Sequence, residues 1–220
     1  VPMVLEESSV VAAVSKAAKF WSERGGFRCE IQNMEKVGQI HLFYEGDKQI
    51  LFNFFNQVEP ILYKETESLT ENMRKRGGGI SSIILKDMTD NLEHYYQVFV
   101  TFLTGDAMGA NFINSCLEQM TQIIEREALI HLSEGSLDVL MSILSNYTPQ
   151  CVVKAEVSAS LTEMTYNDTE GAIFARDFVR AITVADADVY RAVTHNKGVM
   201  NGVDAVVIAT GNDFRAVEAA

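Results

Sequence analysis

The chain has 220 residues, of which 47% are hydrophobic and 22% are charged. This is an ordinary globular composition, with room for one large domain or two small ones. The formal net charge of −12 argues against binding to nucleic acid or to an anionic membrane surface, because both repel an acidic protein. No apolar run approaches the roughly 20 residues of a transmembrane helix. We therefore expect a cytoplasmic protein with no nucleic-acid or membrane partner.

The cysteine pattern predicts neither a disulfide framework nor a zinc site. Cys29, Cys116 and Cys151 are an odd number and show no CxxC spacing. We expect small buried thiols in a reducing compartment and no metal.

The first predicted element is a helix over residues 8–24, where apolar side chains recur at helical spacing. Ser8 or Ser9 is the expected N-cap, and Gly25-Gly26 is the expected end.

The middle of the chain shows alternating strand and helix patterns. Two strands joined by a tight turn come first, and Gly77-Gly78-Gly79 ends the helix that follows them. The predicted order is strand 39–44, strand 49–55, helix 58–76, strands 80–85 and 94–103, helix 107–130 and strand 137–143. This order indicates a small α+β domain with helices on one face of the sheet.

Beyond Asn146, a strand at 151–157 leads into helical segments near 169–183, 187–194 and 198–208. We expect a small domain at 32–145, inserted between residues 1–31 and 146–220 of a larger domain.

The most informative polar stretch is Thr194–Gly202, followed after an apolar run by Gly211-Asn212-Asp213. Charged groups beside an apolar run are paired or functional. A lysine held by a carboxylate, here Lys197 by Asp213, stays protonated and stabilises a developing oxyanion. A structural ion pair is the alternative, but the asparagines in the same stretch favour a site.

Two further stretches carry potential chemistry. Asp106-Ala107-Met108-Gly109-Ala110-Asn111 follows a strand and opens a helix, where small residues and free amides receive anions. A plain cap and tight turn explains it equally well, and it is not a GxGxxG fingerprint. In Glu6-Glu7-Ser8-Ser9, the carboxylates either complement a helix dipole or supply a general acid.

For the remaining basic residues and histidines, a structural role is favoured over a functional one. Arg74-Lys75-Arg76 complements the end of a helix, although it would also meet a phosphate. Only His195 among the histidines lies beside a polar cluster, since His41, His94 and His131 fall in predicted strands or at a helix end.

With these motifs, the chain resembles hydroxymethylglutaryl-CoA (HMG-CoA) reductase of the bacterial-type class II branch. The matching stretches follow the family order: Val1 to Ala13, Asp106 to Asn111, Ile143 to Asn146, Tyr190-Arg191-Ala192, Thr194 to Gly202 and Ala209 to Ala219.

The resemblance implies an oxidoreductase of mevalonate and isoprenoid metabolism, which reduces HMG-CoA to mevalonate and CoA with two NAD(P)H or runs in reverse. It implies Glu7 as the acid, Lys197 as the oxyanion stabiliser and Asp213 between them, tuning their protonation. It assigns substrate binding to Ser9, Asn146, Arg191 and Asn201. The stretch Asp106 to Asn111 matches the cofactor motif.

The resemblance also implies the architecture. A large mixed helical domain with a central helix binds HMG-CoA, and an inserted small ferredoxin-like α+β domain binds the cofactor. The active site lies at the interface of a homodimer or higher homo-oligomer.

Two family features have no counterpart in this sequence. The catalytic histidine belongs to a C-terminal flap, and an N-terminal segment serves dimerisation. His195 lies in the lysine motif and does not take the histidine's role. We therefore expect an internal piece of a longer protein that is inactive by itself.

The cofactor is expected to be NADPH or NADH, with NADPH favoured. Alignment on the glycine-rich turn places Thr70 where some class II members carry an acidic residue that repels a 2′-phosphate. Two alternatives remain open: a non-catalytic acyl-CoA or dinucleotide-binding module of the same fold, and a purely structural fragment. Neither needs the set of Glu7, Lys197 and Asp213.

Overall fold

The computed structural model describes residues 1–3 and 6–218. Val4, Leu5 and Ala219, which belong to the matching stretches above, lie outside the described residues. The chain divides into two compact units, unit 1 comprising residues 1–30 and 154–220 and unit 2 comprising residues 31–153. The boundaries expected from the sequence were 31/32 and 145/146.

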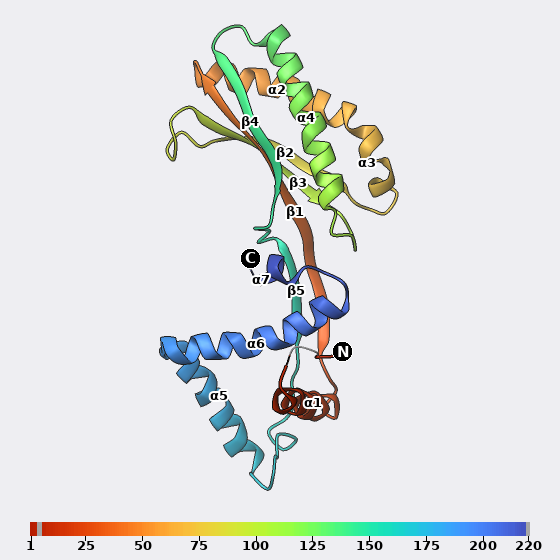
Figure 1. Ribbon diagram of the computed structural model, residues 1–220, viewed down its shortest axis with the longest axis vertical. Helices are drawn as coiled ribbons and strands as arrows, with labels where there is room; N and C mark the ends of the chain where they lie inside the picture. The colour runs from red at the N-terminus through yellow and green to blue at the C-terminus, as the bar shows by residue number, and fades with distance from the viewer. Residues whose placement is uncertain (4–5, 219–220) are drawn as a thin grey trace. The chain divides into compact units, whose positions relative to one another are not determined.

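Unit 2 is built on an antiparallel sheet with its helices packed against one face (Figure 1). The elements of this part of the chain are β1 (Arg28–Glu45), α2 (Lys48–Glu65), α3 (Glu67–Arg74), β2 (Gly79–Asp87), β3 (Tyr95–Leu103), α4 (Ala110–His131), β4 (Ser136–Ser145) and β5 (Cys151–Glu156). The sheet order is β2-β3-β1-β4, and β5 also pairs with β1. With a helical connection after β1 and another after β3, this is the split βαβ arrangement of ferredoxin-like folds.

The core of unit 2 lies between β1 and the helices because side chains alternate between the two faces of a strand. Ile40, Leu42 and Tyr44 are almost fully buried on the helix side. Gly38 continues this row, and a Cβ there would lie 2.7 Å from Leu117 Cδ1 of α4. The sheet and α4 therefore approach each other closely at Gly38.

The strand predicted at 49–55 is wrong, because these residues form the first half of α2. The Asp47 side chain accepts a hydrogen bond from the Gln49 amide and caps the helix start. The buried residues Leu51, Phe54, Phe55, Val58 and Leu62 then recur at helical spacing. The tight turn predicted between two strands is therefore a strand-to-helix connection.

The single helix predicted at 58–76 is two helices, α2 and α3. The helix is interrupted at Thr66, whose hydroxyl donates a hydrogen bond to the Leu62 carbonyl at 2.7 Å. Pro60, expected in the first turn, lies well inside α2 because the helix begins at Lys48.

The described part of unit 1 is mainly helical and also contains the first residues of β1 and the last residues of β5. Its helices are α1 (Ser8–Ser22), α5 (Gly171–Ala187), α6 (Val189–Ala209) and α7 (Phe214–Glu218). Glu7, rather than Ser8 or Ser9, is the N-cap residue of α1. The two segments predicted at 187–194 and 198–208 form one helix, α6, in which Gly198 and Gly202 face open space. Within residues 1–3 and 6–218, no helix is long and apolar enough to cross a membrane.

The expectation of buried cysteines holds only for Cys116. Cys116 has no exposed surface, and burial raises the pKa of its thiol to about 12. Cys29 and Cys151 are exposed, because both lie in strands whose side chains remain uncovered.

Candidate functional site

The polar cluster of unit 1 forms where the start of α1 meets the middle of α6. Lys197 Nζ lies 3.8 Å from Glu6 Oε2. The Lys197 side chain is largely exposed, whereas the Glu6 side chain retains only 18% of its accessible surface. The Lys197 ammonium therefore contacts Glu6 on one side and is exposed to solvent on the other, where a substrate oxygen would reach it.

Glu7 and Ser9 occupy the first turn of α1. The Ser9 hydroxyl donates to Glu7 Oε2 at 3.4 Å. The Glu7 carbonyl accepts the first helical hydrogen bonds, from Val10 and Val11. The helix start thus fixes the backbone of Glu7 next to Glu6, the partner of Lys197.

Asp213 is engaged locally at the start of α7. Its carboxylate accepts from the Arg215 amide and from Arg215 Nε, both at 3.0 Å, and from Arg215 Nη2 at 2.9 Å. These contacts hold the pKa of Asp213 below its ordinary value, with the Arg215 side chain as the largest cause. Within the described residues, the ion pair of Lys197 is to Glu6, and the sequence-based pairing of Lys197 with Asp213 is not observed.

Lys197, Asn201, Asp204 and Ile208 lie on one stripe of α6, because residues three or four apart share a helix face. Asn201, Asp204 and Ile208 line a cavity of about 60 Å³ together with Pro2, Met3, Glu6 and Ala205. The Asp204 Oδ1 atom is buried and has no hydrogen-bond partner among the described residues. A buried carboxylate oxygen without a hydrogen-bond partner is costly, and a bound water, an ion or a functional role would explain it.

Asp204 also has a second acidic neighbour. Burial, together with the neighbouring Asp204 carboxyl, raises the pKa of Glu218 on α7. The sequence analysis considered Glu6 only as part of the stretch Glu6-Glu7-Ser8-Ser9 and assigned no role to Asp204 or Glu218. The spacing 197, 201, 204, 208 would have pointed to Asp204.

The other two substrate-binding candidates are not among the residues that line this cavity. Arg191 is exposed in the first turn of α6, where its amide donates to the capping carboxylate of Asp188 at 2.9 Å. Asn146 is exposed directly after β4 and belongs to unit 2. The four substrate-binding candidates therefore come from three separate elements of two units.

The cofactor motif of unit 2 forms the connection from β3 to α4. Gly105 and Gly109 have φ values of 55° and 79°, which favour glycine. A Cβ at Gly109 would also lie 2.5 Å from Thr104 Cγ2. Asp106, Met108 and Asn111 are exposed around this tight backbone. The first amides of α4 have no helical acceptor, so the loop and helix start fit an anionic ligand.

The glycine-rich turn lies at the same edge of the sheet as this motif. Gly79 pairs with Leu103, the last residue of β3. A Cβ at Gly78 would lie 2.2 Å from the Leu103 carbonyl oxygen, so only glycine permits this approach. The turn at 77–79 precedes β2 and the loop at 104–109 follows β3, so both lie at the same end of this strand pair.

Thr70 lies in α3, one turn before the end of that helix at Arg74. Its side chain is 5% exposed, and its hydroxyl donates to the Glu67 carbonyl at 3.0 Å. Arg74 pairs with Glu67 at 2.8 Å and Lys75 with Glu71 at 2.7 Å. Arg76 is exposed and forms no ion pair with any described residue. Of the three basic residues, Arg76 is therefore the one whose charge could bind an anionic ligand.

Lys36, in the middle of β1, is a further contact of the motif loop that the sequence analysis missed. Its ammonium donates to Thr104 Oγ1 at 2.5 Å and to the Ala107 carbonyl at 2.8 Å. The sequence signal was the strand alternation, which places residues 36, 38 and 40 on the helix side.

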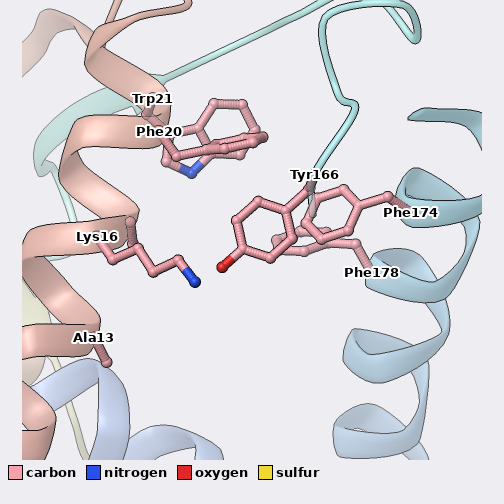
Figure 2. Close-up of a pocket in the computed structure, with 8 residues that line it drawn as sticks. Ala13, Lys16, Phe20, Trp21, Tyr166, Phe174 and Phe178 are labelled. Atoms are coloured by element: carbon pink, nitrogen blue, oxygen red, sulfur yellow. The ribbon is translucent and has the colours of Figure 1, made fainter. Parts of the chain in front are cut away.

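A separate apolar pocket of about 310 Å³ lies between α1, the turn at Tyr166 and α5 (Figure 2). Phe20, Tyr166 and Phe174 pack their rings with centroids 5.1–5.9 Å apart. Lys16 Nζ lies 4.7 Å from the centre of the Tyr166 ring. None of the site residues predicted from the sequence lines this pocket.

The sequence profile of the hydroxymethylglutaryl-coenzyme A reductase family matches residues 1–220. The chain belongs to this family.

Relatives and solved structures agree with the family match. The 3-hydroxy-3-methylglutaryl-coenzyme A reductase of Archaeoglobus fulgidus is 33% identical over all of this chain and 48% of its own length. A probable reductase of Borreliella burgdorferi is 30% identical over 99% of this chain and 48% of its own length. This chain spans about half the length of these relatives.

The fold is similar to that of a class II reductase from Streptococcus pneumoniae, which was solved bound to NADPH in open conformations. The TM-score is 0.81 at 34% identity, and the match covers 97% of this chain and 56% of the other. The mixed α+β fold expected from the sequence is confirmed by this similarity, and so is the class II resemblance.

Proposed function

We propose that the whole protein carrying this chain reduces HMG-CoA to mevalonate and CoA with two NAD(P)H, or catalyses the reverse oxidation. The observation that carries the proposal is the position of Lys197. Its exposed ammonium lies 3.8 Å from Glu6, next to the helix start that holds Glu7. Family membership over residues 1–220 supports it.

The proposed chemistry needs a cation and an acid at one carbonyl oxygen. The thioester takes up one hydride and one proton to give a hemithioacetal, which releases the CoA thiol and becomes an aldehyde. A second hydride and proton convert the aldehyde into the alcohol. In both reductions Lys197 stabilises the negative charge on the oxygen, and Glu7 donates the proton. We assign Asp213 to the same catalytic set as a third member, and in this structure its carboxylate is paired with Arg215.

We assign the binding of the HMG moiety to Ser9, Asn146, Arg191 and Asn201. Arg191 suits the terminal carboxylate, because a guanidinium binds a carboxylate through two parallel hydrogen bonds. Ser9 and the two asparagines supply neutral donors and acceptors for the hydroxyl and carbonyl oxygens.

We assign the dinucleotide to the stretch Asp106 to Asn111 and to the glycine-rich turn beside it. When bound, the nicotinamide supplies the hydride for each reduction. The glycine backbone at 109 and the free amides of α4 suit the pyrophosphate. The neutral Thr70 and the unpaired Arg76 favour a 2′-phosphate and hence NADPH. The relative from Streptococcus pneumoniae was solved bound to NADPH, which supports this choice.

We further propose a cytoplasmic homodimer or higher oligomer with its active site at the interface. Large apolar side chains remain exposed on α5 and α6, among them Phe178, Val179, Val189, Tyr190 and Val193. Such patches mark contact surfaces. The exposed thiols of Cys29 and Cys151 suit a reducing compartment.

The test follows the absorbance of reduced nicotinamide when the whole protein is mixed with HMG-CoA. Lys197→Ala should lower kcat by about 100- to 1,000-fold, because it removes the charge that stabilises the oxyanion. Lys19→Ala, at an exposed lysine of α1 paired with Glu23, is the matched control and should leave turnover unchanged. A folded protein with no turnover in either direction would overturn the enzyme assignment and favour the binding module.

A further inference from the structure

Lys36 occupies a defined place on the sheet. It lies on the helix side of β1, two residues before Gly38, whose Cβ position would contact Leu117 and Ile113 of α4. It pairs with Phe102 of β3, close to the end of that strand. This register brings the base of the Lys36 side chain next to the connection that leads into α4.

The Lys36 ammonium joins two points of that connection. It donates to Thr104 Oγ1 at 2.5 Å and to the Ala107 carbonyl at 2.8 Å. The Thr104 hydroxyl itself donates to the same carbonyl at 2.7 Å, and the Ala107 amide donates to the Thr104 carbonyl at 3.1 Å. Four hydrogen bonds therefore close the segment from Thr104 to Ala107 into one compact turn.

The half-buried charge of Lys36 has no carboxylate partner among the described residues. Removing an ammonium from water is costly, and only neutral oxygens of the loop compensate for it here. A neutral side chain at this position would avoid that cost. The cation also lies near the start of α4, the helix end that favours anions. Both facts indicate a role beyond stability.

We propose that Lys36 is a positioning residue that holds the loop at 104–109 in the shape that receives the phosphates of the dinucleotide. This inference rests on the proposed function. Gly105 and Gly109 give the loop backbone freedom, and that freedom must be lost when a ligand binds. The hydrogen bonds of Lys36 restrict the loop before the cofactor arrives, so that binding loses less conformational entropy.

The test compares Lys36→Met with the unsubstituted whole protein. Methionine keeps the length of the side chain and removes the donors. Because the loop must then lose its freedom when the cofactor binds, the Kd and the KM for NADPH should rise about tenfold or more. The kcat and the KM for HMG-CoA should stay within about twofold. Calorimetric titration with NADPH measures the Kd directly.

Two variants separate positioning from general damage. Lys36→Arg keeps the charge and the donors and should recover part of the lost affinity. Lys64→Met makes the same change at an exposed lysine of α2 and should have no effect. Amide hydrogen exchange without cofactor gives an independent measure, since residues 105–109 should exchange faster in Lys36→Met alone.

The outcomes separate this inference from the proposed function. Unchanged NADPH affinity and unchanged amide exchange in Lys36→Met would overturn the role of Lys36 and leave the reductase assignment intact. If the unsubstituted protein fails to bind NADPH and NADH, both proposals fall. A rise in both KM values together with a fall in kcat and in thermal stability would show a merely structural lysine.

Discussion

At the scale of residues, the cations near the glycine-rich turn differ in whether their charge is available. Glu67 neutralises Arg74 and Glu71 neutralises Lys75, whereas Arg76 has no described ion pair. The sequence shows three consecutive basic residues and does not separate them, because pairing depends on the direction of each side chain from α3.

Arg76→Ala is therefore expected to lower kcat/KM for NADPH by about 10-fold while leaving NADH unaffected, because only NADPH carries the 2′-phosphate. Lys75→Ala, whose charge is already paired, is the control and should have a small effect on both cofactors. Initial rates with each cofactor measure the ratio. Equal efficiencies with NADH and NADPH in the unsubstituted protein would contradict the prediction.

The candidate catalytic residues show the same limit of sequence reasoning. The sequence analysis selected Glu7, Lys197 and Asp213 from polar stretches that match motifs of the reductase family. It paired Lys197 with Asp213, whereas the structure pairs Lys197 with Glu6 and Asp213 with Arg215. A tertiary contact between positions 6 and 197 leaves no trace in local spacing. The contact of Asp213 is local, two residues along the chain.

At the scale of elements, the error at 49–55 has a physical cause. A short apolar run such as Ile50-Leu51-Phe52 fits a buried strand and a helix equally well. Asp47, which caps α2, was the signal that favoured a helix. The longer patterns of β3 and α4 were unambiguous and were predicted correctly.

The contact between β1 and α4 yields a prediction on stability. Gly38→Ala would place a Cβ 2.7 Å from Leu117 Cδ1 and should lower the free energy of unfolding by about 1–3 kcal/mol through overpacking. The added cost of Gly38→Ala should shrink in a Leu117→Ala background, since the two sites share one contact. Urea unfolding of the four proteins measures this coupling. Fully additive effects would contradict the proposed close approach.

At the scale of the whole molecule, the exposed apolar side chains of α5 and α6 predict association. Val179→Asp should shift the whole protein toward monomer and lower its activity, because Val179 is 62% exposed within this surface. Leu129→Asp, at a 91% exposed position of α4, is the matched control and should leave the mass unchanged. Light scattering after size-exclusion chromatography measures the mass. A monomeric unsubstituted protein would contradict the prediction.

The sequence alone determined the α+β class and the family resemblance, and it predicted an inserted small domain and a set of candidate residues. It did so because these features rest on hydrophobic periodicity and on rare local combinations of polar residues and glycines. Only the tertiary structure decided that Glu6 is the partner of Lys197, that Asp204 lies next to Glu218, and that Lys36 closes the loop at 104–109. These contacts join positions far apart in the chain, and their geometry follows from strand register and helix packing.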